Sequence, residues 1–151
     1  MAAKGVLGGD YTYHYTEAGF QKRFWFSAFG YIDLITKAGK VWNKVPYPLL
    51  ILPNANLSYT IQPESYTNMN AMEFISDEYA SWDLTYYMNG NLLNRLPLVK
   101  KLKWREVFCF RGLWGHLTDK NNPMNGGEGL YLFPNGSYTL GKAPYLSLIH
   151  I

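Results

Sequence analysis

The stretch that decides the fold is Ser81-Trp-Asp-Leu-Thr-Tyr-Tyr-Met-Asn89. Its apolar and polar residues alternate with a period of two, which is the pattern of a strand whose two faces differ. One face carries Trp82, Leu84, Tyr86 and Met88, and the other carries Ser81, Asp83, Thr85, Tyr87 and Asn89. A strand of about nine residues is long enough to cross a bilayer when it is tilted.

The same alternation continues on both sides of this stretch, and Gly, Asn and Pro residues separate the segments. Phe108, Phe110 and Trp114 would share one face of a second clear strand, opposite Arg105, Cys109 and Arg111. In total we expect strands over 10–16, 20–27, 31–42, 81–89, 103–117 and 144–151, with a small hairpin over 131–140. Turns are expected at 17–19, 27–30 and 89–91.

The segment from Lys44 to Asp77 should be irregular, because Pro46, Pro48, Pro53 and Pro63 prevent regular strand pairing. A long irregular connection is unusual inside a compact soluble domain. It is typical of a transmembrane barrel, which has long loops on one side and short turns on the other.

Composition narrows the class of protein. Aromatic residues make up 17% of the 151 residues, whereas charged residues also reach only 17%, compared with about a quarter in typical soluble domains. Many Tyr and Trp with few charges suit a surface that meets both lipid and water, and they also suit a carbohydrate-binding β-domain. A net charge of +3 is too small to favour nucleic acid as a partner. No apolar run reaches 18 residues, so we expect no transmembrane helix.

We expect no catalytic, cofactor-binding or metal-binding residues, and therefore no enzyme. The densest acidic group comprises Glu73, Asp77, Glu78 and Asp83, which is interpreted as a solvated loop rim rather than a carboxylate pair. Asp119-x-Asn121-Asn122 lacks the glycine and glutamate of a calcium loop and predicts a polar turn. The histidines His14, His116 and His150 show no metal-ligand spacing, and the single cysteine, Cys109, excludes an internal disulfide.

A basic run is interleaved with leucines and a tryptophan between residues 92 and 105. Its cations are Arg95, Lys100, Lys101, Lys103 and Arg105. Two interpretations remain open: a patch that meets anionic lipid headgroups, and a turn held by apolar anchors with solvated lysines.

Several longer phrases resemble a family of Gram-negative outer-membrane proteins of unknown function. The phrases are Ala38-Gly-Lys-Val-Trp-Asn-Lys-Val-Pro-Tyr-Pro-Leu-Leu50, Asn68-Met-Asn-Ala-Met-Glu-Phe-Ile-Ser-Asp77, Asn89-Gly-Asn-Leu-Leu-Asn-Arg-Leu-Pro-Leu-Val-Lys-Lys-Leu-Lys-Trp-Arg-Glu106, Leu117-Thr-Asp-Lys-Asn-Asn122 and Pro144-Tyr145. The resemblance covers roughly residues 20–146. It implies a C-terminal barrel behind a carboxypeptidase-regulatory-like domain, related to the surface-antigen or outer-membrane-assembly type, and it implies no catalytic residues.

The two ends of the chain depart from this pattern. Met1–Asp10 has no apolar segment of the kind an export signal needs, so we expect the N-terminal domain and upstream strands to be missing. The family continues past Pro144-Tyr145 with further strand, whereas this chain ends in Leu146-Ser-Leu-Ile-His-Ile151. We interpret that tail as a truncated or artefactual end.

The sequence therefore predicts an all-β, antiparallel meander over residues 1–151, forming part of a transmembrane β-barrel with long outer loops. The expected location is the cell outer membrane, with a role in transport, at the surface or in assembly. The expected partners are outer-membrane lipid and, during insertion, the barrel-assembly machinery. A soluble, aromatic-rich β-domain that binds glycans is the first alternative, and a hydrolase using carboxylates near Glu73 and Asp77 is the second.

Overall fold

A computed structural model describes residues 11–58, 65–66, 69–90, 93–95, 97, 99–125, 130–141 and 143–150. The expectations that concern Met1–Asp10, Pro63 and Ile151 lie outside these residues. No helix in the described part of the chain is long and apolar enough to cross a membrane.

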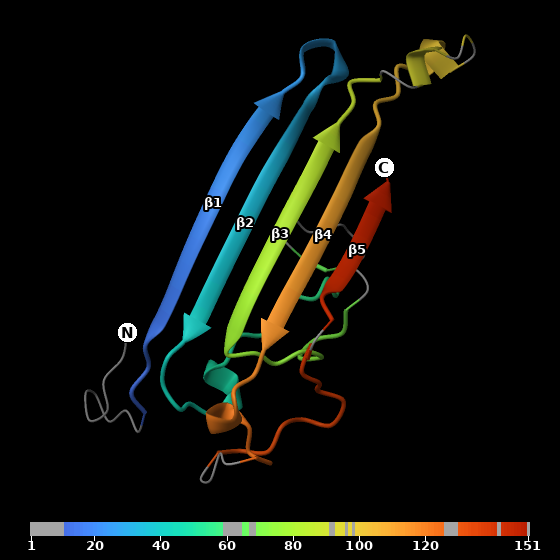
Figure 1. Cartoon of the computed structure of the whole chain (residues 1–151). Helices are drawn as coiled ribbons and strands as arrows, with labels where there is room; N and C mark the ends of the chain where they lie inside the picture. The colour runs from blue at the N-terminus through green and yellow to red at the C-terminus, as the bar shows by residue number, and fades with distance from the viewer. Residues whose placement is uncertain are drawn as a thin grey trace. The chain divides into compact units, whose positions relative to one another are not determined.

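The described chain forms a five-stranded antiparallel sheet in which every strand pairs with its neighbour in sequence, as Figure 1 shows. The strands are β1 (Tyr15–Trp25), β2 (Tyr31–Val41), β3 (Glu78–Tyr87), β4 (Val107–His116) and β5 (Tyr145–His150). The predicted all-β meander is thus confirmed, including the strand that β5 forms at the end of the chain.

The predicted alternation of faces is also confirmed. The polar face of the strands carries Arg23, Asp33, Asp83, Thr85, Cys109 and Arg111, which contact one another across neighbouring strands. The apolar face carries the residues between them: Phe20, Phe24, Ile32, Leu34, Trp82, Leu84, Tyr86, Phe108, Phe110 and Trp114. Lys22 is an exception on the apolar face, where its ammonium group lies 5.3 Å from the centre of the Phe24 ring.

Two of the local predictions are wrong. The expected turn at 17–19 is part of β1, because Gly19 lies beside β2, and pairing with that long strand outweighs its turn propensity. The hairpin expected over 131–140 does not form. Its turn residues do bend the chain, but Tyr138 forms a bridge with Phe74 in the long connection instead of pairing with the first half of the segment.

The connections differ in length and contain short 3-10 helices. The β1–β2 connection is the expected tight turn and includes η2 (Ser27–Phe29). The irregular 42–77 connection includes η3 (Tyr47–Leu49), the β3–β4 connection includes η4 (Leu93–Arg95) and η5 (Val99–Leu102), and the last one includes η6 (Asp119–Asn121). Asn89 and Gly90 turn the chain with φ of 52° and 77°. β4 begins at Val107 rather than at the expected residue 103, so the β3–β4 connection is longer than predicted, and Arg105 lies in it instead of on a strand face.

The chain divides into two compact units. Unit 1 comprises Met1–Ala18, Ala38–Ala80 and Leu113–Tyr145, and unit 2 comprises Gly19–Lys37, Ser81–Gly112 and Leu146–Ile151. Unit 1 contains two clusters of buried apolar residues: Val41, Val45, Leu50, Ile75 and Leu117 in one, and Tyr66, Met69 and Leu113 in the other. Among the described residues of unit 2, no comparable cluster is buried.

Candidate lipid-facing surface

The apolar face of unit 2 is open to its surroundings in the described chain. Phe20 is 55% exposed, Phe24 is 40% exposed and Phe110 is 39% exposed. On β4, Gly112 leaves room for the neighbouring Trp82, since a Cβ atom at this position would overlap the indole ring. Single exposed apolar side chains are common on protein surfaces, whereas a continuous patch of this kind marks a surface that contacts an apolar partner.

Aromatic side chains also gather near the ends of these strands in unit 2. Phe26 and Phe29 are exposed in the β1–β2 turn, and the Tyr86 hydroxyl donates a hydrogen bond of 2.9 Å to the Phe29 carbonyl oxygen. Trp104 is exposed shortly before β4. Rings with an apolar body and a polar tip concentrate where a membrane meets water.

The polar face of unit 2 pairs its charges across neighbouring strands. Arg23 makes two hydrogen bonds to the Asp33 carboxylate, at 2.6 and 2.8 Å. Arg111 lies 2.6 Å from Asp83, and the Thr85 hydroxyl donates to the same carboxylate at 3.0 Å. The same strands therefore carry apolar side chains on one side and charges that neutralise one another on the other. Strands of a barrel with a polar interior have the same kind of contrast between their two sides.

One aromatic row crosses the polar face at the ends of β1, β2 and β3. The Tyr31 ring lies 4.8 Å from the Trp25 ring and 4.5 Å from the Tyr87 ring, and the Arg23 guanidinium lies 4.5 Å from the Tyr31 ring centre. Tyr31 and Tyr87 stack with an interplanar angle of 22°, so each covers a face of the other. Trp25 remains 67% exposed.

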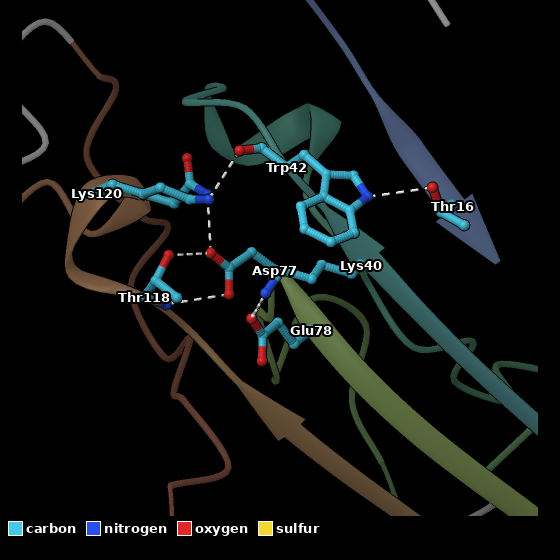
Figure 2. A network of polar contacts seen from close by, with 8 residues as sticks. Thr16, Lys40, Trp42, Asp77, Glu78, Thr118 and Lys120 are labelled. Atoms are coloured by element: carbon cyan, nitrogen blue, oxygen red, sulfur yellow. Dashed lines mark hydrogen bonds and ion pairs between the residues drawn. The ribbon is translucent and has the colours of Figure 1, made fainter.

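In unit 1 the outward side of the strands carries an amphipathic belt made of Thr16, Lys40, Trp42, Glu78, Trp114 and His116. Figure 2 shows that Trp42 donates from its indole nitrogen to the Thr16 hydroxyl at 3.1 Å and that Lys40 forms an ion pair with Glu78. The Lys40 ammonium lies 4.8 Å from the Trp42 ring centre. Trp42 is nevertheless 56% exposed. Ion pairs and tryptophans side by side suit a boundary between headgroups and acyl chains.

Asp77 lies on the opposite side of the strand from Glu78 and is completely buried. Its carboxylate accepts hydrogen bonds from the Thr118 backbone N–H at 3.0 Å and from the Thr118 hydroxyl (Figure 2). It also accepts one from the Asn121 amide at 2.9 Å. The Asn121 side-chain oxygen in turn accepts from the Val45 backbone N–H at 2.9 Å. This network joins the 42–77 connection to the segment after β4.

The four acidic residues singled out in the sequence have separate partners. Glu73 accepts from the Asn70 backbone N–H at 2.7 Å, whereas Asp77, Glu78 and Asp83 bind the groups already described. Asp77 and Asp83 are buried or half-buried and paired, so the prediction of a solvated rim is wrong for them. The solvated interpretation failed because Asp77 is covered by the segment after β4 and Asp83 is covered by Arg111 on the neighbouring strand.

The predicted polar turn at Asp119-x-Asn121-Asn122 is present as η6, and Asn122 accepts from the Met124 backbone N–H at 3.0 Å. Sequence reasoning missed that Asn121 is buried and links two distant segments, because an Asn in a polar run gives no sign of its burial. Within the described ranges, no group of three His, Cys, Asp or Glu side chains could hold a metal ion.

The basic run lies in the β3–β4 connection of unit 2. Its five cations, Arg95, Lys100, Lys101, Lys103 and Arg105, are all exposed. Leu102 and Trp104 beside them are also exposed, at 55% and 59%. Glu106, the one acidic residue in this connection, is buried, and its carboxylate accepts from the Leu93 backbone N–H. Among the described residues from 93 to 105, exposed cations and exposed apolar side chains therefore lie together.

A comparison with protein families matches residues 1–123 to the family described as "Family of unknown function (DUF5686) C-terminal domain". No curated protein and no solved structure matches the chain. Because the matched region covers most of the described sheet, including β1 to β4, the chain belongs to the DUF5686 family through its C-terminal domain.

Proposed function

We propose that this chain is part of an integral outer-membrane β-barrel and that its apolar face lies against acyl chains. The observation that carries the proposal is the contrast between the two sides of the same strands. One side exposes Phe20, Phe24 and Phe110, and the other neutralises its arginines with carboxylates at 2.6 Å. Acyl chains would cover the first side, and a lumen would suit the second.

Strand length supports this proposal. The strands β1 to β4 contain 10 or 11 residues each, close to the 9–11 that a tilted transmembrane strand requires. In lipid every backbone N–H and C=O group needs a partner, and a closed antiparallel sheet provides one. The outer edges of β1 and β5 would pair with further strands of the same barrel.

The belt of unit 1 and the β3–β4 connection of unit 2 extend the proposal to the membrane surface. The belt of unit 1 combines exposed Trp42 with the Lys40–Glu78 ion pair, and the β3–β4 connection of unit 2 exposes cations beside Trp104. Each cation near an anionic membrane surface contributes about 1 kcal/mol of attraction. We propose that outer-membrane lipid is the immediate partner and that the barrel-assembly machinery inserts the protein. A role in transport, at the surface or in assembly, and an N-terminal carboxypeptidase-regulatory-like domain, belong to the same proposal.

The test uses two adjacent positions on opposite faces of β3. In a Cys109→Ser background, Leu84→Cys and Thr85→Cys are each labelled with a nitroxide in the full-length protein reconstituted into lipid vesicles. Oxygen concentrates in acyl chains and polar nickel chelates stay in water, so we expect the label at Leu84 to collide mainly with oxygen. The label at Thr85 should collide less with oxygen. Equal collision profiles, or full-length protein that fractionates as water-soluble, would refute the proposal.

Exposed Trp25 beside the Arg23–Asp33 pair favours one other candidate, a soluble β-domain that binds glycans. An open indole face next to hydrogen-bonding groups is a common element of sugar sites. Such a domain should remain monomeric in buffer without detergent and should bind a polysaccharide. Replacing Trp25 with Ala should then abolish that binding, whereas Phe24→Ala on the opposite face should not.

A further inference from the structure

We infer that the long connections of unit 1 cover the side of its strands that lies opposite the belt and close the barrel lumen there, so that the barrel is not an open diffusion pore. The inference rests on the proposed barrel, because a lumen exists only if the apolar face points to lipid. It narrows the transport role to one that requires movement of these connections. It is carried by contacts within unit 1 alone.

The first contact region lies over β1 and β2. Val41 on β2 is completely buried, together with Val45 and Ile75 from the 42–77 connection and Leu117 from the segment after β4. Tyr15 on β1 packs against the same cluster. Val41 and Tyr15 alternate with the outward belt residues Lys40 and Thr16, so the cluster covers the side of the strands opposite the belt.

The second contact region lies over β3 and β4. Leu113 on β4 is buried beneath Tyr66 and Met69 of the 42–77 connection, and Tyr79 on β3 packs against the same residues. At Gly115 the connection comes so close that a Cβ atom would overlap the Ser76 hydroxyl and lie 3.2 Å from Leu140. Both regions therefore place connections directly on the side of β1 to β4 that lies opposite the belt within unit 1.

Polar contacts hold these connections in place. The Asp77 carboxylate binds Thr118 and Asn121, and Asn121 binds the Val45 backbone, so the two connections are joined at a buried point. Ile75 and Tyr138 add backbone hydrogen bonds, since the Ile75 N–H donates to the Tyr138 carbonyl at 3.0 Å. Close packing of this kind excludes water where the described connections lie on the strands, whereas conduction of solutes would require a continuous water path there.

The experiment measures conductance of the full-length protein in planar lipid bilayers. The native protein should show no steady open-channel current. Asp77→Ala removes the acceptor that joins the connections, and Gly115→Ala pushes Ser76 and Leu140 away from β4, so each should produce a steady open-channel current that the native protein lacks. Glu78→Ala, adjacent to Asp77 but on the outward belt, and Gly112→Ala, on the apolar face of β4, are the matched controls and should leave conductance at the native level.

Two further measurements keep the outcomes distinct. Heat-modifiable migration in gels reports whether each variant still forms a barrel. For a variant that does not, a labelling experiment takes the place of the conductance measurement. Ser76→Cys, in a Cys109→Ser background, should resist a membrane-impermeant maleimide when the rest of the protein is native. It should react when Gly115→Ala is added. A native barrel that conducts steadily, or Ser76→Cys that labels without the second change, would overturn this inference while leaving the proposed membrane location intact. Absence of the protein from the outer-membrane fraction would refute the proposed function itself.

Discussion

The proposed lipid-facing surface predicts that replacing Leu84 with Arg destabilises the protein strongly in a membrane. Leu84 lies well inside β3 (Glu78–Tyr87) and shares the apolar face with Trp82 and Phe110. A cation on the lipid-facing side near the midplane costs about 2–4 kcal/mol. An effect of about 3 kcal/mol changes the folding equilibrium on the order of a hundredfold.

Thr85→Arg is the matched control, one residue further along the same strand. It removes the hydrogen bond of 3.0 Å from the Thr85 hydroxyl to Asp83, which contributes about 0.5–1.5 kcal/mol. The new guanidinium would lie on the polar face, where the Asp83 carboxylate can accept its hydrogen bonds. The net effect should therefore be smaller than that of Leu84→Arg.

The assay is reversible urea unfolding of the full-length protein in lipid vesicles, followed by tryptophan fluorescence. In a soluble protein whose apolar face met water, Leu84→Arg would shift stability by only about 0.5 kcal/mol. Thr85→Arg proving the more damaging change would reverse the assignment of the two faces. Equal effects would remove the basis for a lipid-facing side.

Other variants test the packing of the strands and connections in the same assay. Gly39→Ala should cost about 1–3 kcal/mol, because the new Cβ would lie 2.5 Å from the Tyr79 ring, whereas Gly19→Ala meets nothing closer than 3.8 Å and should be neutral or slightly stabilising. Asp83→Asn should lower the urea midpoint more than Asp33→Asn, because the Arg111–Asp83 pair is less exposed than the Arg23–Asp33 pair; the opposite order would show that exposure does not govern these pairs. Asn121→Ala should cost about 1–3 kcal/mol, since it removes one of the two donors to a buried Asp77 carboxylate oxygen and leaves the buried Val45 N–H without a partner, and an unchanged midpoint would contradict that role.

Period-two patterning predicted the antiparallel meander but not every strand boundary. The strands around Trp82 and Phe110 alternate apolar and polar residues cleanly, and both faces appear in the structure as expected. The same signal failed at Gly19, where a local turn propensity competes with a neighbouring strand that the sequence does not place. It also failed at Tyr138, whose partner Phe74 lies 64 residues away in sequence (138 − 74 = 64).

The polar network of unit 1 could be predicted only in part. Alternation places Asp77 opposite Glu78, but nothing in the sequence indicates that Asn121 fills the space beside Asp77. A buried amide and an exposed amide have the same local signature, because burial depends on segments that meet only after folding. The exposed basic run, in contrast, was visible directly from its spacing of lysines and leucines.

The turn at Gly30 has a consequence for strand alignment. Gly30 adopts φ of +92° and approaches β3 so closely that any Cβ would overlap the Tyr87 carbonyl oxygen. Sliding β2 along β3 by one residue would exchange its two faces, and sliding it by two would bring a residue with a side chain onto that carbonyl. The absence of a Cβ atom at Gly30 thus selects one alignment of β2 along β3. A side chain placed at this position would offer a way to misalign the two strands deliberately.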